Sequence, residues 1–310
     1  MTTAVEVTGL TKRYRSLAAV DDVTFRVREG AITGLLGRNG AGKTTLMRLI
    51  TGQEFATRGE IRVFGEPPVE NARVLSRTCF ISESQRYPDD FRVKHVLASA
   101  PHFFANWDAE YADELVTAFR LNRRQLVKKL SRGQRSAVGV IVGLASRAPL
   151  TIFDEPYLGL DAVARQIFYD RLLADYSEHP RTVIISTHLI DEIAHLLEYA
   201  VVIDDGRIAI DAPVESLTAA AATVAGTSAA VERFVAGRDV VHRARLGGLT
   251  SATLDGVTEA DRAAAREAGL DVGPVSLQEL IVRRTGGERG ENTPDSVAAS
   301  AAPETTEVTR

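Results

Sequence analysis

The run Gly37–Thr44, with the letters GRNGAGKT, stands directly after an apolar stretch from Ile32 to Leu36 and before helical sequence from Thr45. Its spacing fits the pattern G-x-x-x-x-G-K-[ST], in which glycines let backbone N–H groups turn toward bound phosphates. A buried strand, this loop and a helix whose N-terminus faces the phosphates form one structural unit. The chain is therefore expected to contain an α/β domain, and nucleotide binding is the function that this unit predicts.

The loop supplies the first candidate ligands. The Lys43 ammonium can reach the β and γ oxygens of a nucleotide, and the Thr44 hydroxyl can bind Mg²⁺. The predicted nucleotide-binding residues of this segment are Gly37, Arg38, Asn39, Gly40, Ala41, Gly42, Lys43, Thr44 and Thr45. A chance glycine-rich turn would not require an apolar strand before it and a helix after it, so we favour the nucleotide site.

Further strand patterns follow at 150–153, 182–186 and 200–203, with a helical segment between each pair. This alternation predicts a mainly parallel sheet with helices on both faces. Two earlier stretches, 4–7 and 23–27, alternate as strands do. The fold class predicted from the residues is therefore α/β.

We divide the chain into three parts. Residues 1–213 are predicted to form the nucleotide-binding domain, with a helical subdomain at about 86–148, where helical periodicity dominates. Residues 214–284 alternate alanine-rich helical stretches with short strands and predict a small α+β accessory domain. Residues 285–310 hold few large apolar side chains and predict a disordered tail, because little burial offsets the entropy of ordering.

Composition adds three expectations. A formal charge of −4 gives no general attraction to nucleic acid or anionic lipid, although by itself it excludes neither. No apolar run approaches the roughly 18 to 20 residues that span a bilayer, and the first residues lack a leader pattern, so a cytoplasmic location is expected. The single cysteine, Cys79, shares no metal-binding spacing with the histidines, so we expect no zinc or iron site.

Asp154 and Glu155 stand directly after the apolar strand at 150–153 and before Pro156. A carboxylate at that sheet edge can hold Mg²⁺ directly or through water, which is the role predicted for Asp154. Glu155 is the candidate base for the attacking water, a role typically worth on the order of 10²- to 10⁴-fold in rate. Both acids also favour helix N-termini, so capping is an equal alternative from these residues alone.

His188 lies just past the strand at 182–186, at the same predicted sheet edge. Its imidazole can contact the γ-phosphate there, which makes it the second catalytic candidate. A lone histidine in such a place is more often a turn or helix-cap residue. The functional interpretation therefore depends on the neighbouring motifs.

The run Leu130–Gln134, with the letters LSRGQ, lies between the phosphate loop and the acidic strand end. The motifs of this chain, taken in order, are Lys43, Ser131–Gln134, Asp154–Glu155, Gly159–Asp161 and His188. With them, residues 5–213 resemble the nucleotide-binding subunit of an ATP-binding cassette (ABC) transporter. The resemblance implies a P-loop NTPase core of mainly parallel sheet with an antiparallel portion, a helical signature subdomain, and ATP with Mg²⁺ as ligands.

The resemblance further implies that two subunits, identical or different, sandwich two ATP molecules. Ser131, Gly133 and Gln134 of one chain would then contact the ATP held by the other, with a helix N-terminus aimed at the γ-phosphate. Asp161 would couple the two sites across the dimer. Tyr14 matches the aromatic position that stacks on adenine in the family. Without the resemblance, Ser131 is explained equally well as a helix cap.

Three positions depart from the family pattern. Arg132 stands where glycine is usual, and its side chain is expected to point outward. The family glutamine that contacts Mg²⁺ and water aligns with Glu83, but Gln85 follows two residues later, and we favour Gln85 for that role. Tyr157 replaces a small hydroxyl residue after Asp154–Glu155.

The resemblance implies an ATPase that drives a separate integral membrane permease through the helical insert around 86–107, at the inner face of the cell membrane. The segment Ser276–Leu280 resembles the closing helix of bacterial exporter ATPases of the drug and antibiotic-resistance type, so we expect export and no nucleic-acid partner. Two alternatives are a soluble cassette protein that acts on nucleic acid or ribosomes, and a non-hydrolytic ATP-gated clamp. The first usually carries two cassettes or a long coiled coil, which this sequence lacks.

Overall fold

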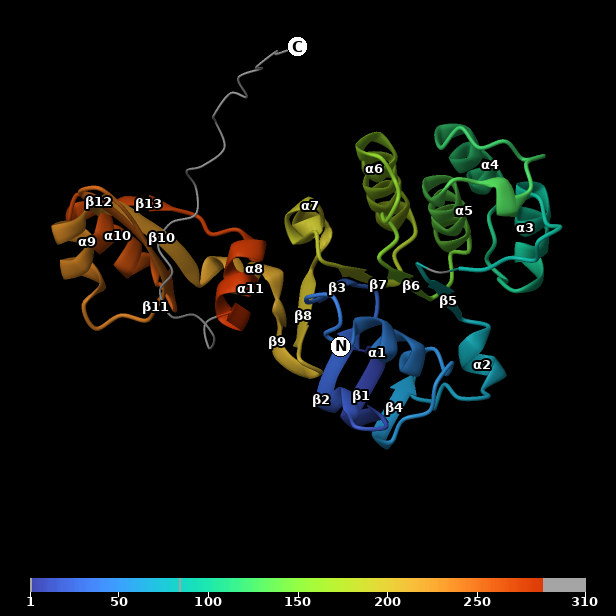
Figure 1. The fold of residues 1–310 in the computed structure, drawn as a ribbon, viewed down its shortest axis with the longest axis horizontal. Coiled ribbons are helices and arrows are strands. Elements are labelled where there is room, and N and C mark those ends of the chain that lie inside the picture. The colour runs from blue at the N-terminus through green and yellow to red at the C-terminus, as the bar shows by residue number, and fades with distance from the viewer. Residues whose placement is uncertain (1, 84, 287–310) are drawn as a thin grey trace, which may run out of the picture.

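The computed structural model describes residues 2–83 and 85–286. A large body of two sheets and several helices carries a smaller sheet with its own helices at one end (Figure 1). The predicted disorder of the tail cannot be compared with the structure from 287 on, because residues 287–310 lie outside the described part of the chain.

The central sheet has six strands and confirms the mainly parallel architecture. Its strands, in spatial order, are β5 (Thr78–Ile81), β6 (Leu150–Asp154), β7 (Thr182–Thr187), β3 (Ile32–Leu36), β8 (Tyr199–Asp204) and β9 (Arg207–Pro213). The first five run parallel, and β9 pairs antiparallel with β8. Every residue of β3, β6 and β7 is buried, as their largely apolar sequences indicate for strands covered on both faces.

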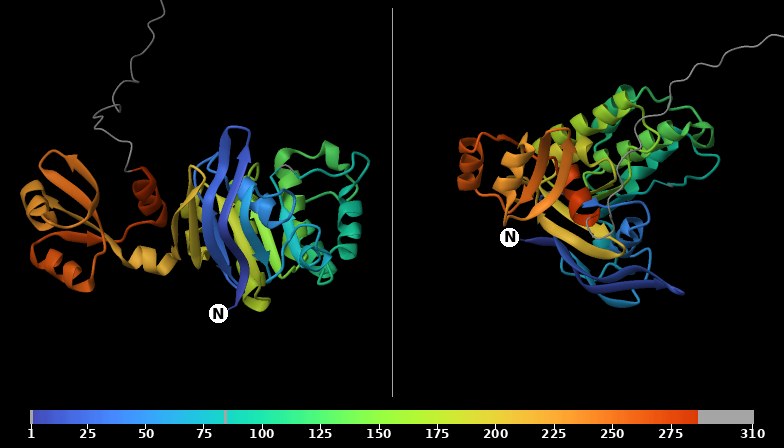
Figure 2. Two further views of the ribbon diagram at one scale, coloured as in Figure 1. Left: turned by 90° about the horizontal axis from the view of Figure 1, so that it is seen from below. Right: turned by 60° about the vertical axis from the view of Figure 1, so that its left-hand side comes forward.

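An antiparallel sheet covers one face of the central sheet, with a helix between them (Figures 1 and 2). Its strands, in spatial order, are β2 (Leu17–Arg28), β1 (Thr3–Tyr14) and β4 (Arg58–Val63). Helix α1 (Lys43–Ile50) buries Leu46 and Met47 in one apolar cluster with residues of both sheets. It begins two residues before the predicted start, because Gly42, with a φ of 110°, ends the loop and leaves Lys43 in the first helical position.

Helices cover the other face of the central sheet, and α3, α4 and α5 form the predicted helical insert (Figure 1). The helices between β4 and β8 are α2 (Ala72–Leu75), α3 (Val93–Ser99), α4 (Ala109–Ala118), α5 (Arg132–Ala145), α6 (Ala162–Glu178) and α7 (Ile190–Ile193). Short 3₁₀ turns span Ala100–His102, Val127–Lys129 and Ala194–Leu196. Cys79 is buried at 1% exposure, as expected for a structural cysteine.

The C-terminal region forms an antiparallel sheet with its own apolar cluster, which confirms the predicted α+β addition. Its elements are α8 (Val214–Ala219), β10 (Ala221–Thr227), α9 (Ser228–Val235), β11 (Val240–Leu246), β12 (Leu249–Asp255), α10 (Glu259–Glu267), β13 (Asp271–Gly273) and α11 (Leu277–Gly286). Helix α11 returns to the large body, where Leu280 and Ile281 join its core beside α7. The division at residues 213 and 284 stays a prediction.

Close packing of α5 on β6 generates a first prediction. A Cβ atom at Gly143, which is buried in α5, would lie 2.3 Å from Cε1 of Phe153 in the core. We expect Gly143→Ala to lower the free energy of unfolding by roughly 1 to 3 kcal/mol, because a packed core has no room for the added methyl group. Urea denaturation measures the change.

Gly248→Ala is the matched control, because a Cβ there meets nothing within 4 Å. Its free energy of unfolding should stay within about 0.5 kcal/mol of the parent. Equal values for the two variants would contradict the close approach of α5 to β6.

Candidate functional site

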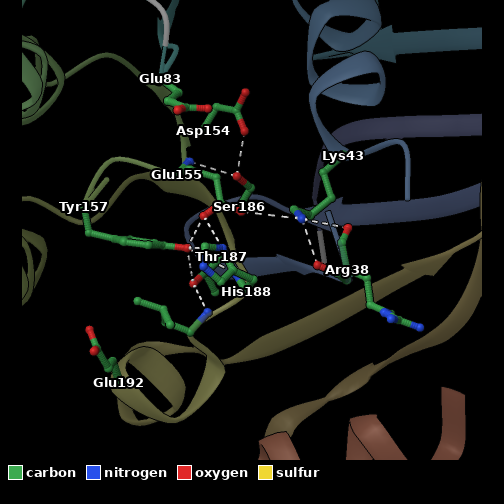
Figure 3. A network of polar contacts seen from close by, with 12 residues as sticks. Arg38, Lys43, Glu83, Asp154, Glu155, Tyr157, Ser186, Thr187, His188 and Glu192 are labelled. Carbon is green, nitrogen blue, oxygen red and sulfur yellow. Dashed lines mark hydrogen bonds and ion pairs between the residues drawn. The ribbon is translucent and has the colours of Figure 1, made fainter. Parts of the chain in front are cut away.

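The phosphate loop joins the C-terminal end of β3 to the N-terminus of α1, as the sequence predicts. Backbone crowding requires glycine at Gly42, where a Cβ atom would lie 2.3 Å from the Ala19 carbonyl oxygen. The buried Lys43 ammonium lies across the loop and donates hydrogen bonds to the carbonyl oxygens of Gly37, at 2.8 Å, and Arg38, at 3.2 Å (Figure 3). The loop therefore presents a helix N-terminus and a fixed cation at one place, which suits a phosphate.

Asp154 ends β6 beside this loop. Its two carboxylate oxygens accept hydrogen bonds from Thr44 Oγ1, at 2.9 Å, and Ser186 Oγ, at 2.8 Å. Burial raises the pKa of Asp154 above its ordinary value, and the hydrogen bonds from Ser186 and Thr44 oppose that rise. Sequence reasoning missed Ser186, although its place at the end of a buried strand next to β6 is a usable signal.

Glu155 follows with a left-handed backbone, at a φ of 50°, and with 7% of its surface exposed. Its Oε2 atom lies 2.8 Å from His188 Nδ1 and accepts a hydrogen bond from the Tyr157 hydroxyl. Its Oε1 atom is buried without a hydrogen-bond partner, 3.5 Å from Lys43 Nζ. A buried carboxylate oxygen without a donor is costly, so a group that binds there would satisfy it.

Tyr157 holds this cluster together (Figure 3). Its buried hydroxyl accepts hydrogen bonds from Thr187 Oγ1, at 2.8 Å, and His188 N, at 3.1 Å, and donates to Glu155. Burial, and then the hydrogen bond to Glu155, raise the pKa of Tyr157 well above its ordinary value, so its proton stays in place. Sequence reasoning noted Tyr157 as a departure and did not include it in the site.

One cavity of about 500 Å³ brings together both catalytic candidates, Tyr14 and part of the phosphate loop. Its lining residues are Tyr14, Leu17, Ala19, Asn39, Gly40, Gly42, Lys43, Thr44, Thr45, Glu83, Arg132, Glu155, Leu158 and His188. Tyr14 stands at its rim with 41% of its surface exposed, which leaves an aromatic ring accessible. The cavity therefore combines an aromatic surface, a phosphate loop, a carboxylate and an imidazole.

The structure changes our preference between Glu83 and Gln85. Glu83 lines the cavity that contains Lys43, whereas Gln85 does not, and the Gln85 Oε1 atom accepts a hydrogen bond from Ser82 N at 3.3 Å. Gln85 lines a neighbouring cavity instead. Of the two residues, Glu83 is the one placed beside the phosphate loop.

The residues predicted to act across a dimer do not line the cavity of their own chain. Arg132, which was not among them, does line it. Ser131 and Gln134 cap α5 reciprocally, with hydrogen bonds of 3.2 and 3.0 Å. Asp161 caps α6 by accepting from Ala164 N at 2.8 Å. Gly133 must be glycine, because a Cβ atom there would lie 2.3 Å from the Gly159 carbonyl oxygen. Ser131, Gln134 and Asp161 therefore cap helices in the structure, and their role in a dimer stays a prediction.

None of the helices in the described part of the chain is both long and apolar enough to cross a membrane. Residues 2–83 and 85–286 hold no group of three or more His, Cys, Asp or Glu side chains suited to a metal ion. The pairing of the Thr44 hydroxyl with Asp154 nevertheless offers two hard oxygen atoms, which are the ligand type that Mg²⁺ takes beside nucleotide phosphates.

Comparison with known proteins places this site in a family. Residues 20–158 match the family described as "ABC transporter". The bacitracin transport ATP-binding protein BcrA of Bacillus licheniformis is 31% identical over 220 residues, which cover 70% of this chain and 72% of the relative. The Nod factor export ATP-binding protein I of Ralstonia nicotianae is 32% identical over 224 residues, which cover 70% of each chain.

Solved structures agree on the fold. An ATP-binding subunit of an ABC transporter, 26% identical, superposes with a TM-score of 0.63 over 69% of this chain and 92% of its own. A dimeric ABC transporter cassette, 20% identical, superposes with a TM-score of 0.60 over 68% of this chain and 98% of its own. The second likeness concerns the fold alone.

The buried Asp154 generates a second prediction. Its raised pKa means that the folded protein binds a proton there more readily than the unfolded chain, whose carboxyl titrates near about 3.9. The stability that this proton brings is present below the unfolded pKa and is lost as pH rises through the folded pKa. We therefore expect Asp154→Asn to raise the urea midpoint of the ligand-free protein at neutral pH, with a smaller gain in acid.

Asp175→Asn is the control with the opposite sign. Asp175 is also buried, but it forms ion pairs with Arg181, at 2.6 Å, and Arg147, at 3.2 Å. Its replacement leaves a buried arginine without its partner, so the midpoint should fall. A loss of stability at neutral pH in Asp154→Asn would contradict the destabilising charge.

Proposed function

Because this chain belongs to the ABC transporters as an ATP-binding subunit that hydrolyses ATP to drive transport, we propose that it powers a separate membrane permease that exports a drug, an antibiotic or a similar compound. The observation that carries the proposal is the single cavity in which Lys43 and Thr44 face Glu155 and His188. The names of two relatives, for bacitracin transport and Nod factor export, support the cargo class and the outward direction.

The loop and its surroundings fit the phosphates of ATP. Backbone N–H groups at the N-terminus of α1 and the Lys43 ammonium supply positive charge where the β and γ phosphates would bind. Tyr14 at the cavity rim supplies an aromatic face for adenine. Substrate binding would thus use contacts from β1, the loop and α1.

The residues that would hold Mg²⁺ are Thr44 and Asp154, whose oxygen atoms already lie 2.9 Å apart. When bound, the ion offsets negative charge on the phosphates. Ser186 fixes the second oxygen of Asp154 and so orients the carboxylate. Gln85, which we first expected to contact the ion, lies outside this cavity, so no role in holding Mg²⁺ is proposed for it.

Glu155 is proposed as the base. Tyr157 and His188 hold its Oε2 atom, so its Oε1 atom is left to accept a proton from water. Lys43 Nζ lies 3.5 Å from the same Oε1 atom, so the base and the cation of the phosphate loop face each other in the cavity. One oxygen of Glu155 is thus hydrogen-bonded and the other is left for water. This arrangement argues against the alternative of a clamp that binds ATP without hydrolysing it.

We propose a dimer of such subunits, identical or different, as the active form. Ser131, Gln134 and Asp161 lie outside the cavity of their own chain, at the N-termini of α5 and α6, and from there they would complete a cavity in a second chain. The N-terminus of α5 would then face the γ-phosphate of ATP bound to the partner. The subunit would be held at the inner face of the membrane by its permease, through the helical insert that carries the exposed Phe103.

Glu155→Gln tests hydrolysis and dimerisation together. The variant should bind ATP but lose at least about 100-fold in turnover, because the amide cannot take the proton, and it should accumulate as a dimer with ATP. Gel filtration with radiolabelled ATP and a phosphate-release assay measure these properties. Adding Ser131→Arg should abolish the dimer and leave binding of ATP by the monomer intact.

Unchanged turnover in Glu155→Gln would show that another group is the base. Loss of monomer binding in Ser131→Arg would show that Ser131 acts within its own chain. Co-purification with a permease that stimulates turnover supports export. Stimulation by nucleic acid alone would favour the soluble cassette alternative.

Tyr157→Phe tests how the base is held. The variant removes one hydroxyl that donates to Glu155 and accepts from Thr187 and His188. We expect kcat to fall roughly 10- to 100-fold, because a carboxylate that can turn is misplaced for the water. The affinity for ATP should stay within about twofold, because Tyr157 does not line the cavity.

The matched control is Tyr169→Phe, which removes another buried tyrosine hydroxyl that donates a hydrogen bond to Glu192, outside the cavity. Its kcat should match that of the parent. Equal losses in the two variants would mean that Tyr157 supports the fold alone.

A further inference from the structure

Two of the three departures from the family pattern are in direct contact. Arg132, the first residue of α5, donates a hydrogen bond from Nη2 to Glu83 Oε1 at 2.6 Å. Glu83 follows β5 and stands 49 positions before Arg132 in the sequence. A carboxylate in place of glutamine and a guanidinium in place of glycine therefore meet as an ion pair.

The aliphatic part of the Arg132 side chain packs against a neighbouring loop. A Cβ atom at Gly159 would lie 2.8 Å from Arg132 Cγ, so the stem of the arginine packs against the loop that follows Glu155. Ser136, one turn further along α5, donates a hydrogen bond to the Leu158 carbonyl oxygen at 2.6 Å. The start of α5 is thus held against the loop that follows Glu155. From this position the Arg132 guanidinium reaches Glu83.

Folding stability does not explain this ion pair. The two side chains are 60% and 45% exposed, and exposed pairs contribute little to stability because water competes for both charges. Their position is more informative, since both residues line the cavity with Lys43 and Glu155. An unpaired carboxylate at Glu83 would repel the phosphates of ATP, whereas the paired one is compensated.

We propose that Arg132 is a positioning residue of the ATP site in its own chain, where it holds Glu83 at the edge of the cavity and compensates its charge. This role is additional to any contact that the signature run makes in a dimer. It rests on ATP binding in this cavity and does not depend on the cargo or the permease. Glu83 and Arg132 then act as a unit, and the loss of Arg132 is harmful only while residue 83 carries a negative charge.

A double-mutant cycle tests the unit. The proteins are the full chain and its variants Arg132→Gln, Glu83→Gln and the double variant, and the measurement is binding of a fluorescent ATP analogue to the monomer with Mg²⁺ and with EDTA. Glutamine at position 132 keeps the Cγ atom that packs on Gly159. Arg132→Gln should weaken binding roughly fivefold, and the double variant should bind within about twofold of the parent.

Ionic strength supplies a second measurement that a purely structural role would not change. The defect of Arg132→Gln should shrink at high salt, because salt screens the repulsion between Glu83 and the phosphates. Arg135→Gln is the matched control: it removes the same charge from α5 at a residue that lines only the neighbouring cavity. Its affinity for ATP should match the parent at both salt concentrations.

Two results would overturn the proposal. Equal weakening in Arg132→Gln and the double variant would mean that Arg132 acts on the phosphates without Glu83. Equal weakening in Arg132→Gln and Arg135→Gln would mean that only the total charge of α5 matters. Failure of the parent to bind the analogue would instead contradict the ATP site itself, so the two failures are distinguishable.

Discussion

The parallel pairing of β6, β7 and β3 is the constraint on which the site depends. In this register Asp154 lies opposite Ser186, and Thr187 lies opposite Leu36, so three strand ends meet at one edge of the sheet. The phosphate loop leaves that edge after β3, the acidic pair leaves it after β6, and His188 leaves it after β7. Segments 150 residues apart in the chain thereby share one cavity, and a shift of register would separate the hydroxyl of Ser186 from the carboxylate that it orients.

Within this frame, the state of Glu155 follows from an uneven distribution of hydrogen bonds. One oxygen is held by Tyr157 and His188, and the other is buried without a donor beside Lys43. Such an arrangement costs stability in the ligand-free protein, as does the ionised Asp154. At a binding site this cost is compensated, because ligands and water supply the missing hydrogen-bond partners. The left-handed backbone of Glu155 belongs to the same pattern.

The helical insert adds a second level of organisation. Gly133 and Ser136 attach the start of α5 to the loop at Leu158–Gly159, and Arg132 extends from that attachment to Glu83. The signature run, the loop of the base and the end of β5 therefore form one connected unit inside a single chain. Helix α11 of the C-terminal region packs beside α7, just after His188, so the accessory sheet is also linked to the site through the large core.

Sequence alone determined the α/β class and the strand–loop–helix unit, and it placed Lys43 in the phosphate loop and Asp154 and Glu155 at a strand end, because local patterns of glycine, apolar and acidic residues specify backbone shape over a few positions. It did not determine which of Glu83 and Gln85 faces the cavity. The two residues lie in one loop, and the direction of each side chain depends on how that loop folds. Nor did it reveal that Tyr157 holds Glu155, because the Tyr157 hydroxyl is itself placed by Thr187 and His188 at the end of a distant strand. It did not show that Arg132 meets Glu83 either, because the chain between them must fold before these side chains approach. Tertiary packing decided those contacts, through the register of the sheet and the close approach of α5 to the loop after β6.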